Sequence, residues 1–87
     1  MAADTAVRFG RNLFMARRRA GFSQEELAGL CSLHRTEIGL LEHGRRLPRV
    51  DTFLKLVAAL EARPADLLNG IAWVPGGEGS GTFITKP

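Results

Sequence analysis

The sequence predicts an all-α fold, with five short helices over about residues 6–70 and a short C-terminal tail over residues 71–87. Three observations lead to this prediction. Apolar residues recur at helical spacing through the first 70 positions. Glycine, proline and capping residues interrupt that spacing at short intervals. The tail lacks the spacing and is rich in glycine, so it is extended or a β-hairpin. A chain of 87 residues makes one compact domain with little core to spare.

The first helix is predicted over about residues 6–20. Gly21 follows it as the C-cap, because glycine adopts the left-handed conformation that ends a helix. Arginines separate the apolar residues of this segment, which recur at helical spacing: Val7, Leu13, Phe14, Ala16 and Ala20.

The second helix is predicted over about residues 24–31, from a capping box at its start. The Ser23 hydroxyl is expected to accept from the Glu26 amide, and the Glu26 side chain to accept from the Ser23 amide. Phe22 before the cap and Leu27 inside the helix have the spacing of a hydrophobic staple.

A third helix, over about residues 35–43, follows after only the three residues 32–34, with Leu33 pinning the turn to the core. Ile38 and Leu41 are expected to face the core, and Gly44 ends the helix. Two short helices joined by a tight turn make a helix-turn-helix, the motif that places its second helix in the DNA major groove.

Two more helices complete the predicted domain. The fourth opens at Asp51, or at Val50 just before it, and the fifth has Pro64 near its first position. Leu67 and Leu68 of the fifth helix are expected to pack inward. The fourth helix has a broad apolar face: Phe53, Leu54, Leu56, Val57 and Leu60.

The tail has two segments of extended character, 71–75 and 82–85, around a glycine-rich loop. An isolated two-stranded hairpin is marginal in water. Trp73, Phe83 and Ile84 must therefore pack on the helices, pair with a second chain or stay partly disordered. Trp73 is interpreted as a packing anchor or a dimer contact.

Positive charge is concentrated in the half with the helix-turn-helix. Residues 1–49 contain nine arginines against five acidic residues, whereas residues 50–87 contain three basic and four acidic residues. Ten of the twelve cations are arginine, which suits bidentate recognition of phosphate and guanine. The overall charge of +3 is by itself weak support for nucleic-acid binding.

Several functional classes lack the residues they need. No apolar stretch approaches the roughly 18 residues of a membrane span, and the N-terminus lacks a signal-peptide layout. The single Cys31 excludes an internal disulfide, and neither histidine has partners at metal-binding spacing. There is no nucleophile–base constellation and no phosphate loop in a strand-to-helix context. We therefore expect a cytoplasmic protein that is not an enzyme and uses no cofactor.

Residues about 9–68 resemble the lambda repressor/Cro-type helix-turn-helix domains, also called the XRE family. The resemblance rests on the combined spacing of residues 21–28, Leu33, Ile38, residues 41–48 and residues 52–60. It implies a five-helix DNA-binding domain, usually of a transcriptional regulator that binds a palindromic operator as a dimer.

The resemblance also implies roles for individual residues. Gln24 is expected to touch phosphate or an outer base, and Arg17 and Glu42 match a structural salt bridge between the first and third helices. His43, Arg45 and Arg46 stand where the family contacts backbone phosphate. The groove-facing positions of the third helix are Arg35, Thr36, Glu37, Gly39 and Leu40.

The chain departs from the family pattern at three positions. His34 replaces the usual Ser or Thr cap of the third helix, so that cap is weaker or is made by other groups. Gly39 and Leu40 stand where polar readers are common. Glycine there costs about 1 kcal/mol of helix propensity, and fewer polar readers imply a lower-information operator or more reliance on DNA shape.

Each groove-facing side chain has more than one interpretation. Arg35 reads guanine O6 and N7 or contacts phosphate, and Thr36 contacts a base edge, a thymine methyl or a phosphate. Glu37 either accepts from cytosine N4 or pairs with a nearby arginine. Leu40 packs on a thymine methyl or the sugar backbone, or is simply exposed.

The sequence therefore predicts a sequence-specific transcriptional regulator, a repressor or autoregulator, that binds double-stranded DNA as a homodimer. The alternative is an antitoxin-like or adaptor protein whose C-terminal tail binds a protein partner. The exposed apolar character of Trp73 and Phe83 motivates that alternative.

Overall fold

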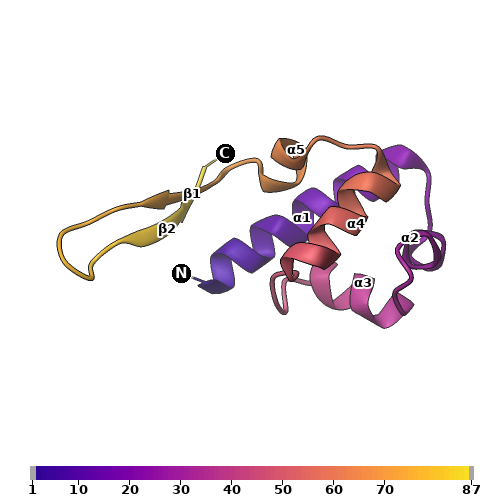
Figure 1. The fold of residues 1–87 in the computed structure, drawn as a ribbon, viewed down its shortest axis with the longest axis horizontal. Coiled ribbons are helices and arrows are strands. Elements are labelled where there is room, and N and C mark those ends of the chain that lie inside the picture. Colours follow the sequence, from indigo (N-terminus) through magenta and orange to yellow (C-terminus); the bar gives the residue numbers. More distant parts are fainter. Residues whose placement is uncertain (1, 87) are drawn as a thin grey trace.

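The structure is a computed structural model and describes residues 2–86. Its elements confirm the predicted all-α fold with a C-terminal β-hairpin (Figure 1). The helices pack into one body, from which the hairpin projects at one end (Figure 1). In chain order the elements are α1 Ala2–Ala20, α2 Gln24–Leu30, α3 Arg35–Glu42, α4 Val50–Leu60, α5 Pro64–Leu68, β1 Ile71–Val74 and β2 Thr82–Thr85.

Helix α1 begins at Ala2, earlier than the predicted start near residue 6. The added turn is held against the body, since Thr5 and Ala6 are buried. Helices α2 and α3 each end one residue earlier than predicted. Cys31 caps α2 through its amide, and a left-handed Ser32 then turns the chain.

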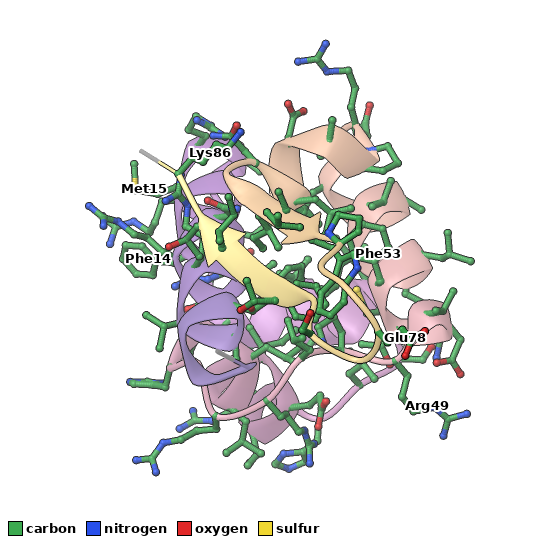
Figure 2. The ribbon with its side chains drawn as sticks, turned by 90° about the vertical axis from the view of Figure 1, so that its left-hand side faces the viewer. Phe14, Met15, Arg49, Phe53, Glu78 and Lys86 are labelled. Atoms are coloured by element: carbon green, nitrogen blue, oxygen red, sulfur yellow. The ribbon has the colours of Figure 1, made fainter. Side chains whose placement is uncertain are left out.

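The core lies between α1 and the other helices, but three residues that helical spacing grouped in α1 are exposed: Val7, Phe14 and Ala20. Val7 and Phe14 are 56% and 38% exposed, whereas Phe9 is buried and packs near the Phe53 ring. Phe14 and Met15 protrude from the side of the molecule opposite Phe53 (Figure 2). The fully buried large side chains are Phe9, Leu13, Leu27, Ile38, Leu41, Leu56 and Leu67.

Two leucines expected to be buried face outward. Leu54 of α4 is 58% exposed and Leu68 of α5 is 44% exposed. The apolar face of α4 is wider than the helical body can cover, because only Leu56 and Leu60 of this helix are buried. Cys31 is also buried, and burial raises the pKa of its thiol.

The capping box at the start of α2 is present as predicted. The Ser23 hydroxyl accepts from the Glu26 amide at 3.0 Å, and the Glu26 carboxylate accepts from the Ser23 amide at 2.8 Å. The hydrogen bond that the Ser23 amide donates to the carboxylate lowers the pKa of Glu26, since it stabilises the ionised form. The capping box therefore fixes the start of α2, which only residues 21–23 separate from the end of α1.

A buried ion pair joins α1 to α3. The Arg17 guanidinium donates to both carboxylate oxygens of Glu42, at 2.5 and 3.0 Å. Its third contact is a 2.8 Å hydrogen bond to the carbonyl of Phe22, between α1 and α2. Gln24 of α2 donates to the same carboxylate at 3.0 Å. Donating hydrogen bonds to the Glu42 carboxylate raises the pKa of Arg17, so the guanidinium stays charged.

Helix α3 crosses α1 at a glycine. A methyl group at Gly10 would overlap the carbonyl oxygens of Leu41 and Glu42. Any side chain there would therefore push the end of α3 away from α1 and separate Arg17 from Glu42.

The hairpin is anchored at its base and exposed beyond it. Its strands are antiparallel, with Trp73 opposite Phe83. Ile71 packs against the helical core, and the Asn12 side chain of α1 donates to the carbonyls of Leu67 and Asn69. Of the three outcomes considered for the tail, packing on the helices holds for the base only.

No helix in the described part of the chain is both long and apolar enough to cross a membrane.

Removing one partner of the buried ion pair should destabilise the fold. We expect Glu42→Gln to lower the free energy of unfolding by about 3–5 kcal/mol, because Arg17 would be left charged and without its counter-ion. Urea unfolding followed by circular dichroism measures the change.

Glu37→Gln is the matched control. Its partner Arg46 is 55% exposed, and such exposed pairs contribute at most about 1 kcal/mol. Equal losses in the two variants would show that the Arg17–Glu42 pair has no special structural role.

Candidate nucleic-acid interface

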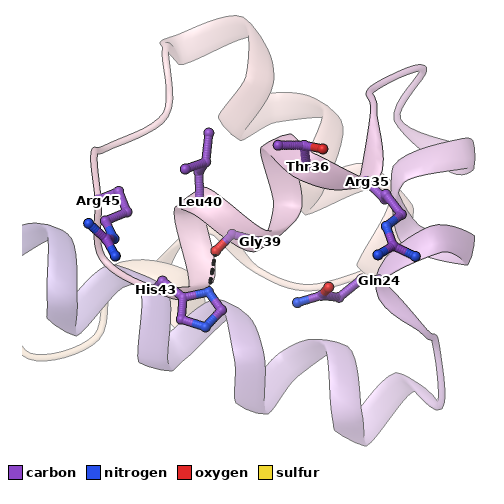
Figure 3. A pocket seen from close by; sticks show the side chains of 7 residues that line it. All are labelled: Gln24, Arg35, Thr36, Gly39, Leu40, His43 and Arg45. Atoms are coloured by element: carbon purple, nitrogen blue, oxygen red, sulfur yellow. Dashed lines mark hydrogen bonds between the residues drawn. The ribbon is translucent and has the colours of Figure 1, made fainter.

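The exposed face of α2 and α3 carries a shallow hollow of about 380 Å³ (Figure 3). We call it the α2–α3 hollow. It lies toward the end of the molecule away from the hairpin (Figure 1). Its lining residues are Gln24, Arg35, Thr36, Gly39, Leu40, His43 and Arg45.

The helical repeat of α3 explains which residues face the hollow. Ile38 and Leu41 are fully buried, so they fix the rotation of α3 about its axis. Residues on the opposite side of the helix then face outward, at its start and in its middle. Seven residues chosen from sequence and family position therefore lie together, and none of the seven is acidic.

The N-terminus of α3 is capped by His34 itself. Its Nδ1 accepts from the amide of Thr36 at 3.1 Å, in place of a Ser or Thr hydroxyl. The sequence predicted a weaker cap or a cap made by other groups. In the structure, the imidazole of His34 makes the cap. This cap requires an unprotonated Nδ1 and positions the first turn, where Arg35 and Thr36 begin the exposed face.

In the middle of the hollow, at Gly39, no side chain covers the backbone of α3. A Cβ atom at Gly39 would meet no heavy atom within 4 Å, so the glycine is not required for packing within the domain. His43 lies beside it, with its Nδ1 2.7 Å from the Gly39 carbonyl oxygen (Figure 3). Leu40 contributes an apolar wall, and the hollow therefore combines polar, basic and apolar groups.

Two of the predicted contact residues lie outside the hollow. Glu37 forms an ion pair with Arg46, the arginine that follows Arg45 after the end of α3. Of the two interpretations of Glu37, the structure shows the pairing with a nearby arginine. Arg45 lines the hollow, whereas the guanidinium of Arg46 is engaged by a carboxylate.

Gln24 connects the hollow to the interior. Its side-chain amide donates to Glu42, the partner of Arg17, while the residue lines the hollow beside Arg35 (Figure 3). The first residue of α2 is thus tied to the ion pair that joins α1 and α3.

The predicted tail contacts form a separate region. Trp73, Phe83 and Ile84 lie on the hairpin, at the other end of the molecule from α2 (Figure 1). In residues 2–86 there is no group of three or more His, Cys, Asp or Glu side chains that could hold a metal ion.

Sequence reasoning missed a second surface, an apolar groove of about 450 Å³. We call it the α4 groove. The signal was present in the broad apolar face predicted for α4, although no groove was predicted from it. Its lining residues are Phe9, Leu47, Pro48, Val50, Phe53, Leu54 and Leu68.

Comparison with known proteins places the chain in a family. The helix-turn-helix domain family matches residues 8–69. Control protein C.BamHI of Bacillus amyloliquefaciens is 37% identical over 70 residues, which are 79% of this chain and 86% of that protein.

Solved structures agree with that match. The restriction-modification controller protein C.AhdI from Aeromonas hydrophila is 40% identical, with a TM-score of 0.68, over 71% of this chain and 94% of that one. The hypothetical transcription factor NHTF from Neisseria is 32% identical, with a TM-score of 0.70, over 78% and 76% of the two chains. The resemblance found in the sequence is therefore confirmed, and the chain belongs to the helix-turn-helix domain family, of the lambda repressor/Cro or XRE type.

Proposed function

We propose that this protein is a sequence-specific DNA-binding transcriptional regulator, a repressor or autoregulator, that acts in the cytoplasm. The observation that carries the proposal is the α2–α3 hollow, which presents basic and polar groups on the outer face of the second helix of a helix-turn-helix. The names of C.BamHI as a control protein and of C.AhdI as a restriction-modification controller protein support a role in gene control.

Recognition divides between positioning and reading. Arg45 and His43, at the C-terminal end of α3, and Gln24, at the start of α2, are suited to bind phosphates. Arg35 and Thr36, in the first turn of α3, are placed to reach base edges in the major groove. Leu40 supplies an apolar contact for a thymine methyl or a sugar.

The Glu37–Arg46 pair adds a constraint on this proposal. A carboxylate paired with arginine on α3 presents less negative charge to the DNA backbone than an unpaired one. Glu37 can accept from cytosine N4 only if it turns away from Arg46 or shares its oxygens between both partners. Arg46 is thus proposed as a phosphate contact that also orients Glu37.

We further propose that the protein binds DNA as a homodimer. One short recognition helix reads only a few base pairs, so a single domain has low specificity. Two copies about 34 Å apart would place both α3 helices in successive major grooves on one face of a palindromic operator.

An adaptor role, in which the hairpin binds a different protein, is the second candidate. It rests on the exposure of Trp73 and Phe83, which are 53% and 41% exposed. Copurification of a second protein at fixed stoichiometry would favour it, and a homodimer without other components would count against it.

Selection of bound duplexes from a random library at about 150 mM salt tests the main proposal, because protein–DNA affinity depends steeply on salt. We expect a two-fold symmetric consensus with half-sites about 10 base pairs apart. Binding that enriches no sequence and disappears with added salt would contradict sequence-specific regulation.

Arg35→Ala should remove base discrimination rather than only affinity. We expect a loss of about 1–3 kcal/mol at one base pair of each half-site and a relaxed preference there. Arg18→Ala removes the same charge from α1, outside the hollow, and should leave the preference unchanged. Titration of the consensus and its single-base variants measures both, and an intact preference in Arg35→Ala would refute the assignment.

Gly39→Ala should raise the stability of the fold but lower the affinity for the operator. A methyl group meets no protein atom there, so the variant gains up to about 1 kcal/mol of helix stability. The same methyl group enters the α2–α3 hollow, and we expect operator affinity to fall at least several-fold.

Gly29→Ala in α2 is the matched control, since a Cβ atom there also meets nothing within 4 Å and Gly29 does not line the hollow. It should stabilise the helix without weakening operator binding. Equal operator affinities of the two variants would show that the DNA does not approach Gly39 closely.

A further inference from the structure

The α4 groove is an apolar surface that the helical body leaves uncovered. Val50 at the start of α4 is 75% exposed, and Leu54 one turn later is 58% exposed. None of the seven lining residues carries a charge. Such a surface is unfavourable in water, and contiguous exposed apolar patches mark interaction sites.

The hairpin carries a second uncovered apolar surface. The Trp73 and Phe83 rings pack edge to face, with their centroids 4.9 Å apart. The indole also lies over Gly81, where any Cβ atom would overlap the ring. Trp73 is thus held by Phe83 of the opposite strand and by Gly81 just before that strand, while half of it remains exposed. An exposed aromatic side chain that is already ordered loses little entropy when it binds.

The two surfaces do not cover each other within one chain. The hairpin projects from the end of the helical body (Figure 1), while Phe53 and the hairpin-loop residue Glu78 lie on the same side of the molecule (Figure 2). A second body that approaches this side would meet the groove and the hairpin together.

We propose that the hairpin is a dimerisation arm, which lays Trp73 and Phe83 of each copy against the α4 groove of the other copy. The inference rests on the proposed homodimer and names its contact surfaces. The contact is isologous, because the same two patches meet twice about a two-fold axis.

The area available favours two reciprocal contacts over one. Covering the exposed halves of four aromatic side chains buries on the order of 300–500 Å², and the groove walls lose a comparable area. With Val74 and the rims of the grooves, the total approaches the about 1,200 Å² at the lower end of stable interfaces. A single hairpin against one groove reaches only half of that area.

The two surfaces are also compatible in charge. The four residues of β1 and the four of β2 are uncharged, like the walls of the groove. Their contact therefore buries no unpaired charge. The α2–α3 hollow lies elsewhere on the molecule, so the arm exchange leaves it open to DNA.

Cross-linking between two single-cysteine variants tests the exchange. Pro75→Cys labels the hairpin, and Val50→Cys labels the rim of the groove. The variants are refolded together and treated with a short bismaleimide. The unmodified chain is the background control, since its only thiol, Cys31, is buried and has a raised pKa.

We expect the mixture to give a covalent dimer containing one copy of each variant, in greater yield than either variant gives alone. A dominant cross-link within Pro75→Cys alone would indicate hairpin-to-hairpin pairing, and one within Val50→Cys alone would indicate groove-to-groove packing. Either result, or the absence of a mixed cross-link, overturns the arm exchange.

Sedimentation without DNA gives an independent measurement. Trp73→Ser should weaken dimerisation at least tenfold, whereas Leu30→Ser, which removes a 60% exposed residue from α2, should not. A monomeric unmodified chain at micromolar concentration, or a Trp73→Ser dimer of unchanged affinity, overturns the inference. Operator selection is a separate readout, so a symmetric consensus together with a failed cross-link would refute the arm alone and leave the proposed function standing.

Discussion

The orientation of the recognition helix depends on the Arg17–Glu42 ion pair. One guanidinium from α1 reaches the carboxylate at the end of α3 and the carbonyl of Phe22 before α2, and Gln24 completes the network from α2. Isolated helices of seven or eight residues are not stable in water. Their mutual position must therefore come from tertiary contacts, and this network joins all three helices through two adjacent charged groups.

Close backbone packing makes that network possible. Gly10 allows the last turn of α3 to lie against α1, with its carbonyl oxygens where a methyl group would stand. Gly39 has the opposite role, because its side-chain position is empty and faces the hollow. One glycine thus serves the fold, and we propose that the other, which costs helix stability, allows DNA to approach the backbone.

Features set by neighbouring residues were predictable from the sequence, and features set by distant packing were not. The capping box at Ser23 and the turn at Gly21 follow from local chemistry and are present. The exposure of Val7, Leu54 and Leu68 depends on which side of each helix the rest of the body covers. Helical spacing gives the width of an apolar face but not the partner that covers it. Helical spacing therefore groups Leu54 and Leu68 with the core residues, whereas in the structure they line the α4 groove.

The candidate DNA site was also predictable only in part. The sequence indicates which face of α3 is exposed, but not how the side chains on it pair. Family position and the buried Ile38 and Leu41 determine which side of α3 faces outward. The imidazole cap of His34 and the pairing of Glu37 with Arg46 depend on side-chain geometry that residue type alone does not specify.

The two proposed binding surfaces are both supported by residues of helix α1. Arg17, near the end of α1, holds the network behind the α2–α3 hollow, while Asn12 and Phe9 support α5 and the α4 groove. Helix α1 has 19 residues and is about 28 Å long. A continuous helix curves only gently over this length, so the residues that support the two surfaces keep a fixed relative position. In the proposed arm-exchanged dimer, the seating of each arm on its partner sets the spacing between the two α3 helices. We therefore expect the hairpin to determine which half-site separation the protein accepts.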